Sequence, residues 1–169
     1  MLIEMKIHGL AVDPASNTPI IILQGTEEDQ TLPIWIGLLE ASSIATAIQD
    51  ITFQRPMTHD LFKNFIEKLH MKIKNIEIYD IKDNTFYSKI HFTAQDYTFT
   101  LDSRPSDAIA MALRFKAPIL VEEKLFIPSK EDTSPIGFSS YMMDKSREGK
   151  QWADYLQSLS PDAYGKYKM

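Results

Sequence analysis

The chain has 169 residues, of which 44% are hydrophobic and 24% charged, with a formal net charge of −5 and no cysteine. These values are typical of one globular domain with a sizeable core, and they exclude a disordered chain, a disulfide scaffold, a thiolate metal site and a cysteine nucleophile. The acidic balance opposes nucleic-acid binding through overall charge, although a local basic patch or bound cations can reverse the sign.

The first part of the chain has the patterns of β-strands. Apolar and polar residues alternate over residues 3–8, which is the period of a strand with one solvent-facing side. Gly9 predicts a break, residues 13–17 predict a turn, and Pro33 favours an edge position or a strand start. The predicted strands are residues 3–8, 20–23 and 31–36.

Helical spacing begins after Gly37. Apolar residues recur every three or four positions along residues 40–51 and again along 58–69, so two amphipathic helices are predicted. Thr58 is the predicted N-cap of the second helix. The polar side of the first helix holds Ser42, Ser43, Thr46, Gln49 and Asp50.

Strands return in the second half of the chain. They are predicted around residues 76–78, 86–92, 97–101 and 118–121, with a helix over 108–116 before the last of them. This helix is apolar almost all round, which predicts a buried position. Its one polar stripe holds Asp107 and Arg114, two turns apart, and this arrangement favours a polar contact between the two side chains.

These elements predict an α+β fold: a mixed or antiparallel β-sheet core with three main helices packed against it, plus a short C-terminal helical tail. Residues 1–130 form the predicted domain, and residues 131–169 form a C-terminal extension with a linker and a short amphipathic helix over 152–159. The chain has no signal peptide and no run of about 18 apolar residues, so we expect no membrane contact and a cytoplasmic location.

A strand-to-helix junction is the strongest candidate for chemistry. Asp102 ends a predicted strand and Asp107 lies in the first turn of the buried helix, with Arg104 between them. Two carboxylates that flank an arginine are able to hold a divalent cation and clamp a phosphate. The alternative is helix capping, with Ser103 or Ser106 as the N-cap. Capping and ligation are compatible, because open helix N-termini also bind anions.

A second candidate lies at the start of the second helix. His59 is suited to act as a ligand or as a general acid or base, with Asp60 as its neighbour in the chain. Adjacent residues on a helix point in different directions, so these two cannot form a side-by-side pair. The alternative is a second capped helix start with a half-buried histidine.

Glu40 is the third candidate, because it falls on the apolar side of the first helix. A carboxylate in that position needs a partner, or its pKa rises. Arg55, Arg104 or a metal ion would serve. An arginine–glutamate ion pair that ties two elements together is at least as good an interpretation as catalysis.

Four motifs follow one another along the chain, at residues 33–41, 55–61, 83–87 and 102–110. In this order they resemble the bifunctional nuclease domain family over residues 1–130. The resemblance implies an α+β fold, a homodimer, and nuclease activity on DNA and RNA. The polar positions that the family shares fall here on Glu40, Arg55, His59, Asp60, Asp102, Arg104, Ser106 and Asp107.

Two hypotheses follow from these residues and from the resemblance. In the first, the protein hydrolyses phosphodiester bonds in nucleic acid, and the catalytic residues are His59, Asp60 and Asp107. The substrate-binding residues are Arg55, Arg104 and Ser106. The ligands of Mg²⁺ or Mn²⁺ are Glu40, Asp102 and Asp107. In the second, the same side chains form a structural ion-pair network in a non-catalytic ligand-binding or regulatory module.

Overall fold

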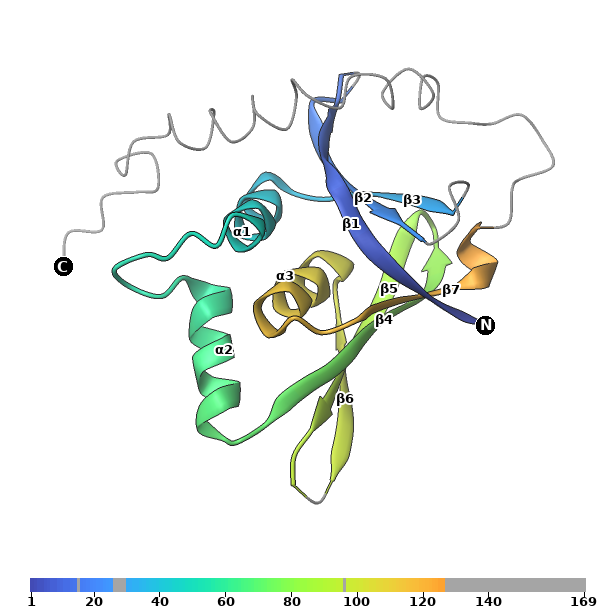
Figure 1. Cartoon of the computed structure of the whole chain (residues 1–169). Helices are drawn as coiled ribbons and strands as arrows, with labels where there is room; N and C mark the ends of the chain where they lie inside the picture. Colours follow the sequence, from blue (N-terminus) through green and yellow to red (C-terminus); the bar gives the residue numbers. More distant parts are fainter. Residues whose placement is uncertain (15, 26–29, 96, 127–169) are drawn as a thin grey trace. The chain divides into compact units, whose positions relative to one another are not determined.

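The computed structural model describes residues 1–14, 16–25, 30–95 and 97–126 (Figure 1). The chain divides into two units, Met1–Ile127 and Pro128–Met169, and only the first contains described residues. The extension predicted over 131–169, with its linker and amphipathic helix, lies outside the described residues.

Within the described residues, seven strands form one sheet and three helices accompany it, which confirms the predicted α+β class. The strands are β1 (Leu2–Asp13), β2 (Thr18–Gln24), β3 (Thr31–Trp35), β4 (Lys72–Lys82), β5 (Thr85–Thr93), β6 (Thr98–Ser103) and β7 (Ile119–Glu122). The helices are α1 (Leu38–Ile48), α2 (Thr58–Lys68) and α3 (Pro105–Phe115), and a short 3-10 turn, η1 (Glu123–Phe126), follows β7.

The order of strands in the sheet is β3-β2-β1-β7-β4-β5-β6. β7 comes last in the chain but lies in the middle, antiparallel to β1 and parallel to β4. All other neighbouring pairs are antiparallel, so the sheet is mixed. β3 is an edge strand, as Pro33 indicated, because proline has no backbone N–H to donate to a neighbouring strand.

Helix α3 is the centre of the helical layer. It packs against β4 and β5, while α1 packs against β2 and α3, and α2 packs against α3. Figure 1 shows α3 between the strands and the other two helices. Its residues Ala108–Ala112 are buried, as the all-round apolar pattern predicted. The largest fully buried side chains come from the sheet and from all three helices: Phe92, Ile21, Leu23, Ile44, Ile66, Ile76, Ile78, Ile109 and Met111.

The starts of two helices differ from the capping predictions. Arg104, not a serine, is the N-cap residue of α3, and Pro105 follows at the first helical position, where its missing N–H costs nothing. The Ser103 hydroxyl instead lies 3.1 Å from that of Ser88 on β5. In α2 the N-cap residue is Met57 rather than Thr58. These corrections leave Asp107 and Asp60 in the first turns of their helices, as expected.

Gly9 does not end the first strand, although the sequence predicted a break there. β1 continues to Asp13, and the register with β2 shifts between Ile7 and Gly9. A β-bulge accounts for the difference, because it accommodates an irregular residue without ending the pairing. β1 therefore pairs with β7 through its first residues and with β2 through the rest.

Candidate active site

The N-terminus of α3 carries an arginine held between two carboxylates. Arg104 Nε and Nη2 donate to Asp107 Oδ2 and Oδ1 at 2.7 and 3.1 Å, which is a bidentate pair. Arg104 Nη1 donates to Glu40 Oε1 on α1 at 2.9 Å. The side chain of Arg104 is nevertheless 64% exposed, so its guanidinium is accessible from solvent. Arg104 is thus one of the partners that the sequence proposed for Glu40.

His59 extends this group toward α1. Its Nε2 lies 3.1 Å from Asp107 Oδ1, and its Nδ1 lies 2.8 Å from the hydroxyl oxygen of Ser43. The side chain of His59 is 18% exposed. One imidazole therefore connects all three helices, because Ser43 belongs to α1, His59 to α2 and Asp107 to α3.

The charges around Asp107 keep it ionised. Burial would raise the pKa of this carboxyl, but the hydrogen bonds and charges of Arg104 and His59 outweigh burial and hold the pKa below its ordinary value. The hydrogen bond and charge of Asp107, with a further contribution from Glu40, raise the pKa of Arg104. The group is thus an ionised acceptor facing a charged guanidinium and an imidazole.

Acidification is expected to reduce the stabilising effect of Asp107. Because its pKa is depressed in the folded state, its ionised form stabilises the fold above the unfolded pKa of about 3.9, and this stabilisation is lost as pH falls through the folded pKa. Urea denaturation of wild type and Asp107→Asn at about pH 7 and about pH 3 measures the effect. The difference in unfolding free energy between the two proteins is expected to shrink at the lower pH. A constant difference would contradict the pairing.

A second group of contacts, centred on Arg114, joins the same three helices. Arg114 Nε donates to Asp60 Oδ1 at 2.6 Å, and Arg114 Nη1 donates to the carbonyl oxygens of Ser43 and Ala110 at 3.2 and 3.0 Å. Asp60 Oδ2 also accepts from the backbone N–H of Met57 at 3.2 Å. The Arg114 side chain is only 8% exposed, so it is a buried tie between α1, α2 and α3.

The polar contact predicted between Asp107 and Arg114 is wrong. Asp107 pairs with Arg104 and His59, while Arg114 pairs with Asp60. Two turns of helix separate positions 107 and 114 by about 10 Å along the axis, and each finds a partner closer at hand on another element. His59 and Asp60 have different partners, as their adjacent positions on the helix predicted.

The structure brings together four of the predicted site residues, Glu40, His59, Arg104 and Asp107. Asp60 lies next to them through Arg114. Ser106 is buried in α3, Arg55 is exposed between α1 and α2, and Asp102 is exposed on β6 in register with Lys89 of β5. The hydrogen-bonded group formed by the described residues includes none of these last three.

The carboxylates that the sequence proposed as metal ligands have other partners or lie outside the hydrogen-bonded group in the described residues. In the described residues, no three histidine, aspartate or glutamate side chains gather as a metal-binding set. Glu40 and Asp107 both accept hydrogen bonds from Arg104, whose positive charge opposes a cation at the same oxygens. The metal dependence expected from the sequence therefore stays a prediction.

Ser43 and Arg114 are the two contributors that the sequence did not mark as site residues. Ser43 sits on the polar side of α1 beside Ser42, and no motif distinguishes the two. Only the approach of α2 to α1 places the Ser43 hydroxyl against His59. The sequence marked Arg114 only as a charged residue on a helix predicted to be buried, and this did not identify Asp60 as its partner.

Another histidine–carboxylate pair lies on the sheet and provides a comparison. His91 Nε2 on β5 is 2.9 Å from Glu77 Oε2 on β4, and Lys89 Nζ is 3.2 Å from Glu77 Oε1. The pair has no serine at the other imidazole nitrogen among the hydrogen bonds of the described residues. It therefore resembles the His59–Asp107 pair in type but not in surroundings.

Comparison with known proteins places the chain in a family. A family model described as the bifunctional nuclease domain matches residues 21–133. An uncharacterized protein of Mycobacterium tuberculosis is 34% identical over 167 residues, which cover 95% of this chain and 97% of that protein. Bifunctional nuclease 1 of Oryza sativa subsp. indica is 26% identical over 116 residues, or 67% of this chain and 35% of that protein.

Bifunctional nuclease 2 of Oryza sativa subsp. japonica is 29% identical over 122 residues, which cover 70% of this chain and 38% of that protein. The matched part thus spans little more than a third of either rice protein. No helix in the described part of this chain is long and apolar enough to cross a membrane. With its domain match over most of its length and its full-length mycobacterial relative, the chain belongs to the bifunctional nuclease domain family.

Proposed function

We propose that this chain is a nuclease that hydrolyses phosphodiester bonds in DNA, RNA or both. The observation that carries the proposal is the imidazole of His59, which is bonded through both ring nitrogens and lies beside the exposed guanidinium of Arg104. Family membership and the names of the rice relatives support the substrate class.

His59 supplies proton transfer in this proposal. A histidine oriented by a carboxylate is a common general acid or base, because its proton is exchanged near neutral pH. Asp107 fixes the ring and stabilises the imidazolium that forms when the ring takes a proton. Arg114 and Asp60 hold the three helices in place around it.

Arg104 binds the scissile phosphate and stabilises the negative charge that grows on it. A phosphate oxygen that reaches Nη1 takes the place of Glu40 there, while the bidentate bonds to Asp107 keep the guanidinium in position. Asp107 and Glu40 together outweigh the single positive charge of Arg104. Binding to nucleic acid is therefore weaker than at a basic patch, and cations in solution are expected to assist it.

One observation favours the alternative, a non-catalytic ligand-binding or regulatory module. Every guanidinium nitrogen of Arg104 donates one hydrogen bond to a carboxylate, so the protein balances the charge of Arg104 without a ligand. A structural ion-pair network would look like this. Replacing one member of such a network would lower the stability of the fold without changing any rate of catalysis.

A cleavage assay on labelled single- and double-stranded DNA and RNA decides between the two. It compares wild type with Arg104→Gln, in Mg²⁺, Mn²⁺ or EDTA. We expect wild-type cleavage and a loss of about 10²-fold in Arg104→Gln, because one charge-stabilising donor is removed. Lys82→Gln is the matched control: Lys82 is also an exposed cation paired with a carboxylate, Asp80, and lies outside the site. Equal faint cleavage by all three proteins would indicate a contaminant and leave the alternative standing.

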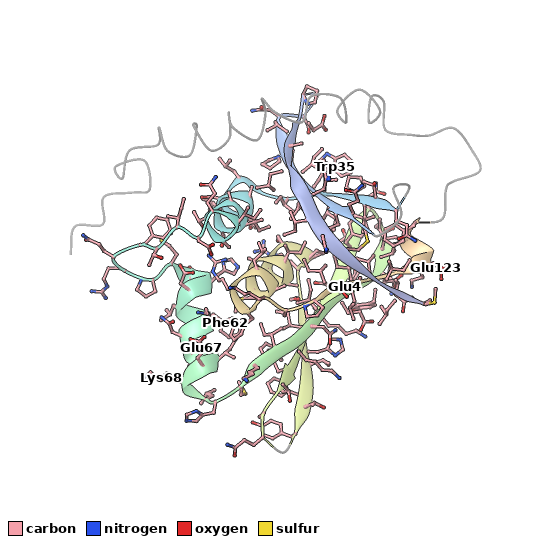
Figure 2. The ribbon with its side chains drawn as sticks, in the orientation of Figure 1. Glu4, Trp35, Phe62, Glu67, Lys68 and Glu123 are labelled. Carbon is pink, nitrogen blue, oxygen red and sulfur yellow. The ribbon has the colours of Figure 1, made fainter. Side chains whose placement is uncertain are left out.

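The homodimer implied by the resemblance stays a prediction. Three large apolar side chains of α2, those of Leu61, Phe65 and Leu69 at its end, are half exposed or more. Figure 2 shows Phe62, Glu67 and Lys68 along the same helix. Exposed apolar side chains that gather in this way are typical of surfaces that pack against another protein. Light scattering at several protein concentrations measures whether two copies associate.

A further inference from the structure

The hydrogen bonds of His59 fix which of its nitrogens is free to take a proton. Both oxygens of Asp107 accept hydrogen bonds from Arg104, so Asp107 acts as an acceptor, and His59 Nε2 carries the hydrogen that bridges the 3.1 Å separation from Asp107 Oδ1. In the neutral imidazole, Nδ1 then carries a lone pair. The hydrogen in the 2.8 Å contact at Nδ1 therefore comes from the hydroxyl of Ser43.

We infer that Ser43 is the nucleophile of this site, with His59 as its general base and Asp107 as the group that orients the base. The inference rests on the proposed function for its substrate class, a phosphodiester. A hydroxyl, an imidazole and a carboxylate bonded in this order form the arrangement that activates a serine for attack.

The surroundings of Ser43 suit this role. Its carbonyl oxygen accepts from Arg114, which fixes the backbone that carries the hydroxyl. Glu40 lies three residues before it on α1, so the two side chains are neighbours on the helix surface. Arg104 binds both Glu40 and Asp107, and Asp107 binds the imidazole that contacts the Ser43 hydroxyl, so these shared partners hold the guanidinium near that hydroxyl. A phosphate on Arg104 would thus lie near the attacking oxygen.

The reaction consists of two displacements at phosphorus. Ser43 Oγ forms a bond to phosphorus as its proton moves to His59 Nδ1, the bond from phosphorus to the leaving nucleoside oxygen breaks, and that oxygen takes the proton from His59. Water then attacks the phosphoserine diester and gives a proton to His59. The bond from Ser43 Oγ to phosphorus breaks, and the proton returns to Ser43. One water molecule is consumed, and no oxidant or reductant is needed.

Direct attack by water on the substrate is the competing mechanism. The geometry disfavours it, because the lone pair at His59 Nδ1 already accepts from Ser43 and a water molecule would have to displace that hydroxyl. A merely structural role for the Ser43–His59 bond is the other competitor. A measurement that detects a covalent bond to Ser43 distinguishes the inference from both of these competitors.

The test labels the full chain with a fluorophosphonate, a reagent that reacts with activated serine hydroxyls, and locates the label by intact mass and peptide mapping. We expect one label per chain, on Ser43, with labelling lost in Ser43→Ala and His59→Gln and retained in Ser42→Ala. Ser42 is the matched control, because it is the adjacent serine of α1 with similar exposure. Circular dichroism establishes that each variant is folded.

Cleavage is measured on the same proteins, with a loss of about 10³-fold or more expected in Ser43→Ala. Acid quenching during turnover of bis(p-nitrophenyl) phosphate is expected to show an aryl-phosphoryl adduct on Ser43. Cleavage that is equal in wild type and Ser43→Ala would overturn the nucleophile and leave the nuclease proposal intact. Labelling of Ser43 without any cleavage would support the activated serine and overturn the phosphodiester substrate. Absence of both label and adduct would overturn the inference.

Discussion

Replacing His59 by glutamine is expected to lower the rate of phosphodiester cleavage by about 10²–10⁴-fold, the usual contribution of a general acid or base. Glutamine retains hydrogen-bonding capacity toward Ser43 and Asp107, but its amide cannot accept a proton at neutral pH. The fold is therefore expected to persist while proton transfer is lost. Initial cleavage rates and thermal unfolding of the same preparations measure the two effects.

His91→Gln is the control for this substitution. His91 is also a partly buried histidine bonded to a carboxylate, but it lies on β5 with Glu77 as its partner. Its replacement is expected to leave the cleavage rate within about twofold of wild type and to change stability by no more than about 1 kcal/mol. Equal losses of rate in the two variants would assign the effect to stability and remove His59 from the mechanism.

Replacing Arg114 by leucine is expected to lower the free energy of unfolding by about 2–3 kcal/mol. The change removes the hydrogen bonds to Asp60 and to the carbonyl oxygens of Ser43 and Ala110, so Asp60 loses its charged partner and each carbonyl oxygen loses one donor. Removal of one partner of a fully buried ion pair costs about 3–5 kcal/mol. The expected loss here is smaller, because the Asp60 side chain is 32% exposed and regains water.

Urea denaturation measures this loss, and Lys63→Ala is the comparison. Lys63 pairs with Glu67 on the exposed side of α2, where such a pair contributes about 0.3–0.5 kcal/mol. Cleavage by Arg114→Leu is also expected to fall, because Arg114 ties the helices that carry Ser43, His59 and Asp107. An Arg114→Leu protein as stable as Lys63→Ala would show that the three contacts are not a structural tie.

Periodicity predicted most elements of the fold because each depends on residues close in sequence. Residues 108–112 of the apolar helix predicted over 108–116 are buried, and the isoleucine-rich runs are inner strands of the sheet. The order of strands could not be read from the chain, because β7 pairs Val121 with Ile3, and no local pattern encodes so distant a register. The N-cap of α3 was missed for a similar reason, since the Ser103 hydroxyl is bonded to Ser88 on another strand.

Four of the eight predicted site residues lie together, and for Glu40 the signal was its place in a local pattern. Glu40 on an apolar helix side requires a partner, and Arg104 is that partner. Ser43 gave no such signal, because a serine on the polar side of an amphipathic helix is ordinary. Its position opposite His59 depends on how α1 and α2 approach each other, and that approach is set by tertiary packing. Metal ligation by Glu40, Asp102 and Asp107, and substrate binding by Arg55 and Ser106, stay predictions.

The central position of β7 has a consequence for the nascent chain. β1–β3 and β4–β6 are two antiparallel groups, and each can pair as soon as its own strands have been synthesised. Among the described strands, β7 alone pairs with both groups, and its residues 119–122 come after both in the chain. Until those residues leave the ribosome, β1 and β4 each present an open edge, and such edges recruit strands from other chains. The interval before β7 is made is therefore when a growing chain most needs a chaperone.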